Sequence, residues 1–125
     1  MQTLIWPHFD YCNIVQCDAT TDDVLRLQRC LNSCVRYIFN LKKDCHLTPY
    51  FNTLTWLKVK ERRDLRIAVE VYKILRDKNP SYLYSLFQYL SDYHSHNTRI
   101  GNKLSTPRPI TTSYNKFFLV MGSRL

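Results

Sequence analysis

The residues best suited to chemistry in this chain are two groups of cations that could contact phosphate. The first group places five cations within nine residues: Lys58, Lys60, Arg62, Arg63 and Arg66. The second group is spread along a helical pattern: Arg26, Arg29 and Arg36. Lys and Arg bind phosphate oxygens without reading base sequence. Free backbone donors at a helix start near Lys58 would add to such a site. These eight residues are the predicted nucleic-acid-binding residues.

A solvated helix surface explains the same cations. Arg62 and Arg66 lie four residues apart, with Glu70 four further on, and each such intrahelical pair contributes roughly 0.2 to 0.5 kcal/mol. The nearby acids are too few to neutralise the first group. A basic stripe opposite a core face, as in the second group, is also typical of a solvated helix face. Both interpretations stay open.

Catalytic chemistry is not indicated by the remaining residues. Cys45 and His46 are adjacent, and adjacent side chains seldom point at each other, so they do not form a typical nucleophile and base. Asp10 has no second carboxylate nearby to share acid and base roles. Gly101 and Gly122 stand alone, so there is no glycine-rich phosphate loop. We expect no catalytic residue and no cofactor.

The cysteines have two interpretations, a zinc site or small core residues. The available ligands are Cys30, Cys34, Cys45 and His46. Their spacing is unlike that of common zinc fingers, and His94 and His96 in a polar turn are more typical of surface residues. We therefore expect no metal site. The five cysteines are interpreted as small core residues of a protein in a reducing compartment.

The charge is positive and unevenly distributed. Eighteen Lys and Arg against ten Asp and Glu give a formal charge of +8. Residues 26–43 hold five bases and no acid, and so do the residues beyond Tyr93. Such a field attracts nucleic acid or an anionic membrane. No apolar run approaches the roughly twenty residues of a membrane span, and residues 1–6 lack the features of a signal peptide. We expect an intracellular protein, nuclear or cytoplasmic, that is neither secreted nor bound to a membrane.

The sequence predicts a mainly α fold, a small bundle of about four to five helices with an irregular C-terminal tail. Two glycines among 125 residues argue against a β-sandwich. Helices are expected over residues 2–15, 22–40, 49–55, 59–77 and 80–90. Residues 1–93 would form a helical domain. Residues 94–125 would form a polar turn and a tail, expected to be truncated, in which residues 117–120 are compatible with a short strand.

Helical periodicity predicts which faces are buried. In residues 22–40 the apolar stripe is made by Val24, Leu27, Leu31, Cys34, Val35 and Ile38. In residues 59–77 it is a wide arc of Leu65, Ala68, Val71, Tyr72 and Leu75, flanked by Ile67, Val69 and Ile74. Trp56 and Leu57 are expected core anchors between helices. Thr20 or Thr21, and later Thr48, are the expected caps.

Several short motifs occur in a fixed order along nearly the whole chain. They are PHFDYCNIV at 7–15, HLTP at 46–49, LTWLKV at 54–59, YKIL at 72–75 and PSYL at 80–83. Together they resemble the segment that follows the palm in reverse transcriptases of LINE-type, non-LTR retrotransposons. Two residues depart from the family pattern. Gln16 stands where an aromatic residue is frequent, and Lys58 replaces a common proline, which adds charge to the candidate site.

The resemblance implies a non-catalytic fragment of an RNA-directed DNA polymerase. In the family, metal-binding aspartates lie in the palm, whereas Asp22 and Asp23 here are expected first-turn acids of a helix. The fragment would be inactive alone. It would pack behind the thumb and hold template RNA or a primer–template duplex, so its partners would be that nucleic acid and the missing palm and thumb. Tyr37, Tyr50 and Trp56 are expected core residues, with base stacking as an alternative. A purely structural role, or a host-recruited adaptor that binds proteins through an apolar patch, also stays open.

Overall fold

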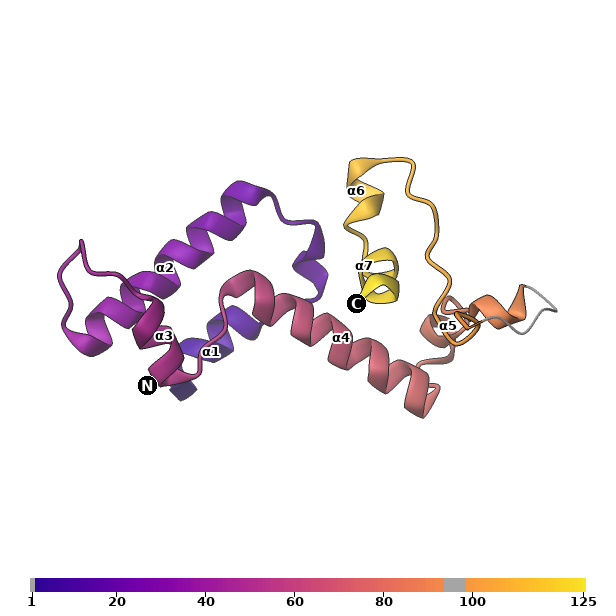
Figure 1. The fold of residues 1–125 in the computed structure, drawn as a ribbon, viewed down its shortest axis with the longest axis horizontal. Coiled ribbons are helices and arrows are strands. Elements are labelled where there is room, and N and C mark those ends of the chain that lie inside the picture. The colour runs from indigo at the N-terminus through magenta and orange to yellow at the C-terminus, as the bar shows by residue number, and fades with distance from the viewer. Residues whose placement is uncertain (1, 94–98) are drawn as a thin grey trace. The chain divides into compact units, whose positions relative to one another are not determined.

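The computed structural model describes residues 2–93 and 99–125, and within them the chain is mainly helical (Figure 1). The predicted fold class is confirmed. The described residues contain no β-strand, only an isolated antiparallel bridge between Tyr89 and Leu104. The chain divides into two compact units, residues 1–63 and 64–125. The division predicted between residues 93 and 94 falls inside the second unit, next to residues that the structure does not describe, and stays a prediction.

The first unit contains α1 (Gln2–Asp10), the 3-10 turn η1 (Val15–Asp18), α2 (Thr21–Phe39), α3 (Thr48–Leu54) and the start of α4 (Val59–Asp77). The first helix is shorter than predicted. It contains Pro7, and just after its end the Tyr11 amide donates to the Pro7 carbonyl at 3.1 Å. Cys12 then adopts a positive φ of 50°. A residue in this left-handed conformation cannot continue an α-helix, so the prediction of helix up to residue 15 is wrong.

The ends of α2 are set by local side-chain chemistry. The Thr20 hydroxyl accepts a hydrogen bond from the Asp23 amide at 3.2 Å, which confirms one of the two predicted caps. Asp22 and Asp23 occupy the first turn, where carboxylates complement the helix dipole. At the other end, Asn40 is left-handed, with a φ of 50°. Asn tolerates this conformation better than most residues, and the helix ends there.

The core of the first unit joins residues from α2, α3 and the start of α4. Its buried members are Leu31, Val35, Phe51, Trp56 and Val59. The Trp56 ring meets Trp6 edge to face, with 4.9 Å between centroids. Trp56 is therefore a core anchor as predicted, but Leu57 is 37% exposed and the prediction for it is wrong.

The start of α3 differs from the prediction. Thr48 is already helical, Pro49 lies in the first turn, and the residue before the helix, Leu47, makes no side-chain cap. The expected capping role of Thr48 is therefore wrong. Proline still marks the helix start because it has no amide hydrogen to leave unpaired there.

The second unit buries part of the α4 face that the periodicity predicts. Ile67, Val71 and Ile74 are buried, whereas Leu65 is 49% exposed and Tyr72 62% exposed. The prediction is therefore wrong for Leu65 and Tyr72, at one edge of the arc, and confirmed for the buried residues at the other edge. Apolar residues occur around most of this helix, so periodicity alone does not fix the centre of the buried face. The buried face is the one that contacts the C-terminal helix, including Gly122. A Cβ at Gly122 would lie 2.5 Å from the Val71 Cγ2 atom, so the two backbones approach closely there.

Beyond α4 the described residues of the second unit contain short elements (Figure 1): α5 (Ser81–Tyr84), η2 (Leu90–Asp92), α6 (Thr112–Asn115) and α7 (Phe118–Arg124). The helix predicted from residue 80 to residue 90 ends at Tyr84. The short strand suggested for residues 117–120 is wrong, because these residues lead into α7. There Leu119 and Val120 are buried and Phe118 meets Phe87 edge to face. The polar turn predicted at 94–98 lies outside the described residues.

Candidate nucleic-acid interface

Arg62, a central member of the predicted cluster, makes internal contacts within the first unit. Its Nε and Nη2 atoms donate to the two carboxylate oxygens of Asp10 at 2.7 and 2.6 Å. The guanidinium also lies 3.8 Å from the ring centroid of Trp6. A bidentate Arg–carboxylate pair is among the strongest hydrogen-bonded pairs in proteins. Arg62 therefore ties α4 to α1, and this geometry does not favour it as a phosphate ligand.

Arg63 is also used internally. It is only 6% exposed, and its Nε donates at 3.2 Å to the side-chain oxygen of Asn13, which is itself buried. Asp10 and Asn13 both belong to the motif at residues 7–15, so that motif supplies the partners of both arginines. Sequence reasoning missed these pairs, since about fifty residues separate the partners. The signal in the sequence was the spacing of Asp10 and Asn13, three residues apart, which suits pairing with two adjacent arginines.

The start of α4 offers fewer free backbone donors than predicted. The Lys58 amide donates to the Glu61 carboxylate at 3.2 Å, and the Val59 amide donates to the Gln28 side-chain oxygen at 2.9 Å. Side chains therefore already satisfy two of the donors that would have received a phosphate. The prediction of open donors at this position is wrong for both amides.

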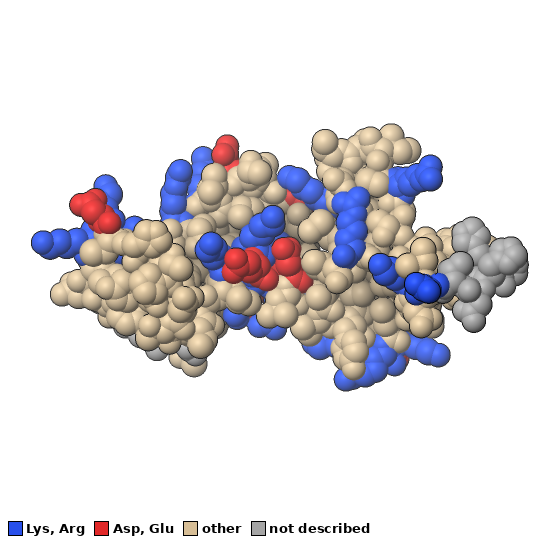
Figure 2. Space-filling view, in the orientation of Figure 1, with Lys and Arg blue, Asp and Glu red and all other residues tan. Residues whose placement is uncertain are grey.

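Four other predicted residues remain open to solvent in the first unit. Arg26, Arg29, Lys58 and Lys60 are exposed, and within the described residues their side chains form no salt bridge or hydrogen bond. Figure 2 shows Lys and Arg side chains at the surface, with acidic side chains among some of them. The remaining candidate surface is therefore made of these four cations, two on α2 and two at the start of α4.

The last two predicted residues lie elsewhere. Arg66 is exposed, lies in the second unit and is not without an interaction partner. Arg36 is half-buried and lines an open pocket of about 710 Å³. The prediction that Arg36 shares the solvent-facing basic stripe with Arg26 and Arg29 is therefore wrong. It lies closer to the core because the loop after α2 folds back over the end of that helix.

The cysteines do not behave as predicted core residues. Cys12 and Cys30 are exposed and the other three are half-buried, all as free thiols. Among the residues that the structure describes, no group of three or more His, Cys, Asp or Glu side chains could hold a metal ion. Cys45 and His46 both line the pocket beside Arg36. His94 and His96 lie outside the described residues.

Comparison with known protein families, with curated proteins and with solved structures finds no match for this chain. Within the described residues no helix combines the length and apolar character needed to cross a membrane. Functional inference therefore depends on the motifs, the exposed cations and the pocket.

Proposed function

We propose that the first unit binds the sugar–phosphate backbone of template RNA or of a primer–template duplex without reading its sequence. It would do so as a non-catalytic region of a LINE-type RNA-directed DNA polymerase. One observation carries the proposal: four exposed cations, Arg26, Arg29, Lys58 and Lys60, have no acidic partner within the described residues. In a polymerase, such contacts hold the duplex while residues elsewhere perform the chemistry. We expect the protein to act inside the cell, in the nucleus or cytoplasm.

The physical basis of this binding is the release of condensed counterions. Each phosphate neutralised by Lys or Arg contributes about 0.7 to the slope of log K against log salt for a single strand, and about 0.9 for a duplex. The first unit holds nine basic and six acidic residues. This modest excess supports weak, salt-sensitive binding. It does not support recognition of particular bases.

An exposed aromatic residue supports the same surface. Tyr37 is 79% exposed, so the prediction that it is a core residue is wrong. It lies on α2, eleven residues after Arg26. Eleven residues are close to three helical turns, so the two residues share a face of the helix. An aromatic ring there can stack on an unpaired base. Trp56 is buried and Tyr50 packs on Phe39, with 4.9 Å between ring centroids, so these two rings serve the core.

The test is a titration of fluorescent single-stranded RNA, duplex DNA and an RNA–DNA hybrid at several salt concentrations. The test variant carries Arg26→Gln, Arg29→Gln and Lys60→Gln. The control removes three exposed cations of the second unit, with Lys73→Gln, Lys78→Gln and Lys103→Gln. Both variants lose the same charge, so any difference between them reports the location of binding. Lys58 is left intact because it also lines the pocket.

A second candidate function is a structural or protein-interaction module, and an apolar stripe in the second unit favours it. Leu65, Val69 and Tyr72 follow one another at helical spacing on α4 and are all exposed. Such a stripe suits contact with another protein surface, including the rest of a polymerase. This candidate predicts that Leu65→Gln with Tyr72→Gln abolishes binding to a separately produced LINE-type palm and thumb. Equal binding by the variant would exclude it.

A further inference from the structure

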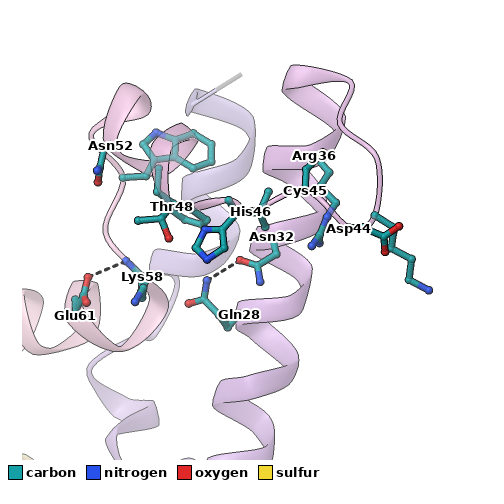
Figure 3. Close-up of a pocket in the computed structure, with 14 residues that line it drawn as sticks. Gln28, Asn32, Arg36, Asp44, Cys45, His46, Thr48, Asn52, Lys58 and Glu61 are labelled. Carbon is teal, nitrogen blue, oxygen red and sulfur yellow. Dashed lines mark hydrogen bonds between the residues drawn. The ribbon is translucent and has the colours of Figure 1, made fainter.

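An open pocket in the first unit, beside Arg36, combines charged, amide and aromatic side chains. It is open, has a volume of about 710 Å³, and is walled by α2, the loop before α3, α3 itself and the start of α4. Figure 3 shows Gln28, Asn32 and Arg36 along α2, with His46 between that helix and Thr48. Small-molecule sites typically have volumes of roughly 300 to 1,000 Å³. The space is sufficient for a nucleotide.

The charged residues of this wall are three cations and two acids, a net excess of one positive charge. Arg36, Lys43 and Lys58 line it, against the two acids Asp44 and Glu61. The Glu61 carboxylate already accepts a hydrogen bond from the Lys58 amide at 3.2 Å. An anion entering the pocket therefore meets an excess of cations, and two of them, Lys43 and Lys58, are exposed and can make the first contact.

Two buried donors in the same wall have no acceptor. The Arg36 Nε and Trp56 Nε1 atoms are shielded from solvent and find no hydrogen-bond partner among the described residues. Both groups can only donate, and an unpaired buried donor is costly. The group that suits them carries several acceptor oxygens and no competing donor.

The rest of the wall suits an aromatic or sugar moiety. Phe51 and Trp56 are buried core residues that also line the pocket. Asn32 accepts a hydrogen bond from Gln28 at 2.9 Å through its side-chain oxygen, which leaves its amide nitrogen to donate. Apolar ring surface beside amide and cationic donors is a combination that suits a nucleotide.

We propose that this pocket binds a phosphate monoester carried by a nucleotide, through Arg36, Lys43 and Lys58. The monoester phosphate has about two negative charges and three terminal oxygens, which matches a wall of cations and unpaired donors better than the single charge of a backbone diester. The nucleotide is either free or the phosphorylated 5′ end of a strand. The proposal does not depend on Arg26, Arg29 or Lys60, so it can hold or fail independently of backbone binding.

The experiment follows the indole N–H resonance of Trp56 by NMR in the full chain, with Trp6→Phe used to assign it. The probes are inorganic phosphate, AMP, a 5′-phosphorylated tetraribonucleotide and the same tetraribonucleotide with a 5′ hydroxyl. Lys43→Gln and Arg36→Gln are the test variants. Lys42→Gln is the matched control, because Lys42 is exposed and adjacent but does not line the pocket.

The proposal predicts a saturable shift of the Trp56 resonance with AMP or with the 5′-phosphorylated strand. Whichever of the two binds more tightly identifies the source of the phosphate. Lys43→Gln should weaken binding about tenfold, as expected for loss of one charge-assisted contact, and Lys42→Gln should change it less than about twofold. If Arg36→Gln fails to fold, Lys43→Gln still decides.

Three results would overturn the proposal. They are no shift with either AMP or the phosphorylated strand, equal weakening by Lys42→Gln and Lys43→Gln, and, where the strands do bind, equal binding of the phosphorylated and hydroxyl strands. Binding to the nucleic-acid backbone is measured separately. Lys43→Gln should leave the salt dependence of long-RNA binding nearly unchanged, and the Arg26, Arg29 and Lys60 triple variant should retain AMP binding.

Discussion

The helices α2 and α4 are each nineteen residues long, and each carries apolar and basic residues at helical spacing, yet they use them differently. On α2 the predicted faces hold at the centre, where Leu31 is buried and Arg29 is exposed. On α4 the expectation is reversed at several positions. Arg63 is buried, while Leu65 and Tyr72 are exposed.

The difference arises from the partners of each helix. All of α2 belongs to the first unit, whereas α4 begins there and continues into the second. The buried residues of α4 form a single stripe: Val59, Arg63, Ile67, Val71 and Ile74. Arg63 can lie in it because Asn13 accepts its hydrogen bond. Periodicity therefore predicts a helix reliably, but the neighbours decide which face is buried.

The largest expected effect contrasts two apolar residues of α4. Ile67 is fully buried and Leu65 is half-exposed. Ile67→Ala should lower the free energy of unfolding by about 2 to 5 kcal/mol, whereas Leu65→Ala should change it by less than about 0.5 kcal/mol. Urea denaturation followed by circular dichroism measures both. Equal losses would mean that Leu65 contributes to the core and that the sequence-predicted arc was right.

The next effect contrasts arginines of the two helices. Arg62→Ala removes the bidentate pair with Asp10 and the contact with Trp6, and should cost about 1 to 3 kcal/mol of unfolding free energy. Arg29→Ala on α2 should cost less than about 0.5 kcal/mol.

A double-mutant cycle with Asp10→Ala isolates the Arg62 pair. A coupling free energy indistinguishable from zero would show that Arg62 is a solvated cation after all, and would return it to the candidate binding surface.

A smaller effect concerns the residues that end the helices before the two loops of the first unit. Asn40 after α2 and Thr55 after α3 both have positive φ, 50° and 55°. Asn tolerates this conformation, but a β-branched residue is strained in it. Thr55→Gly should therefore raise the free energy of unfolding by about 1 kcal/mol, whereas Asn40→Gly should change it by only a few tenths. Thermal unfolding of both variants measures this difference. A larger stabilisation by Thr55→Gly than by Asn40→Gly would show that the backbone at Thr55, before α4, is strained.

The smallest effect is at the end of α4. A hydrogen bond from Arg76 lowers the pKa of Asp77 below its usual value. A carboxyl group with a depressed pKa contributes stability above its unfolded-state pKa, and loses it as the pH falls through the folded-state value. Both side chains are exposed, so solvent screens the pair. Asp77→Asn should change acid unfolding only slightly, and a large shift of the acid midpoint would contradict this.

Local signals allowed much of the fold to be predicted. The bounds of α2 and α4, the Thr20 cap and the buried Trp56 all follow from residues close together in sequence. The predicted ends of α1 and α5 were wrong because the backbone turns after Asp10 and Tyr84, although the helix propensity of the following residues allows the helices to continue. The prediction for the C-terminal segment was wrong because α7 is stabilised by burial of Leu119 and Val120 in the second unit. The spacing of apolar residues within the segment does not reveal that burial.

The candidate site was less accessible to sequence reasoning. Separating structural from open cations required knowing that Asp10 and Asn13 contact Arg62 and Arg63 across about fifty residues. The pocket combines Arg36 of α2 with residues such as Lys43 and Lys58 from later segments. In the sequence, Arg36 belongs to the predicted basic stripe and Lys58 to the predicted start of a helix, while Lys43 lies between two predicted helices.

The central claim is that open cations of the first unit bind nucleic-acid backbone, and the salt titration tests it most directly. For single-stranded RNA, the Arg26, Arg29 and Lys60 triple variant should lower the slope of log K against log salt by about 2, at roughly 0.7 per lost phosphate contact. The Lys73, Lys78 and Lys103 variant should retain the slope of the unmodified chain. Equal slopes for all three proteins, or negligible binding by the unmodified chain at low salt, would contradict the claim.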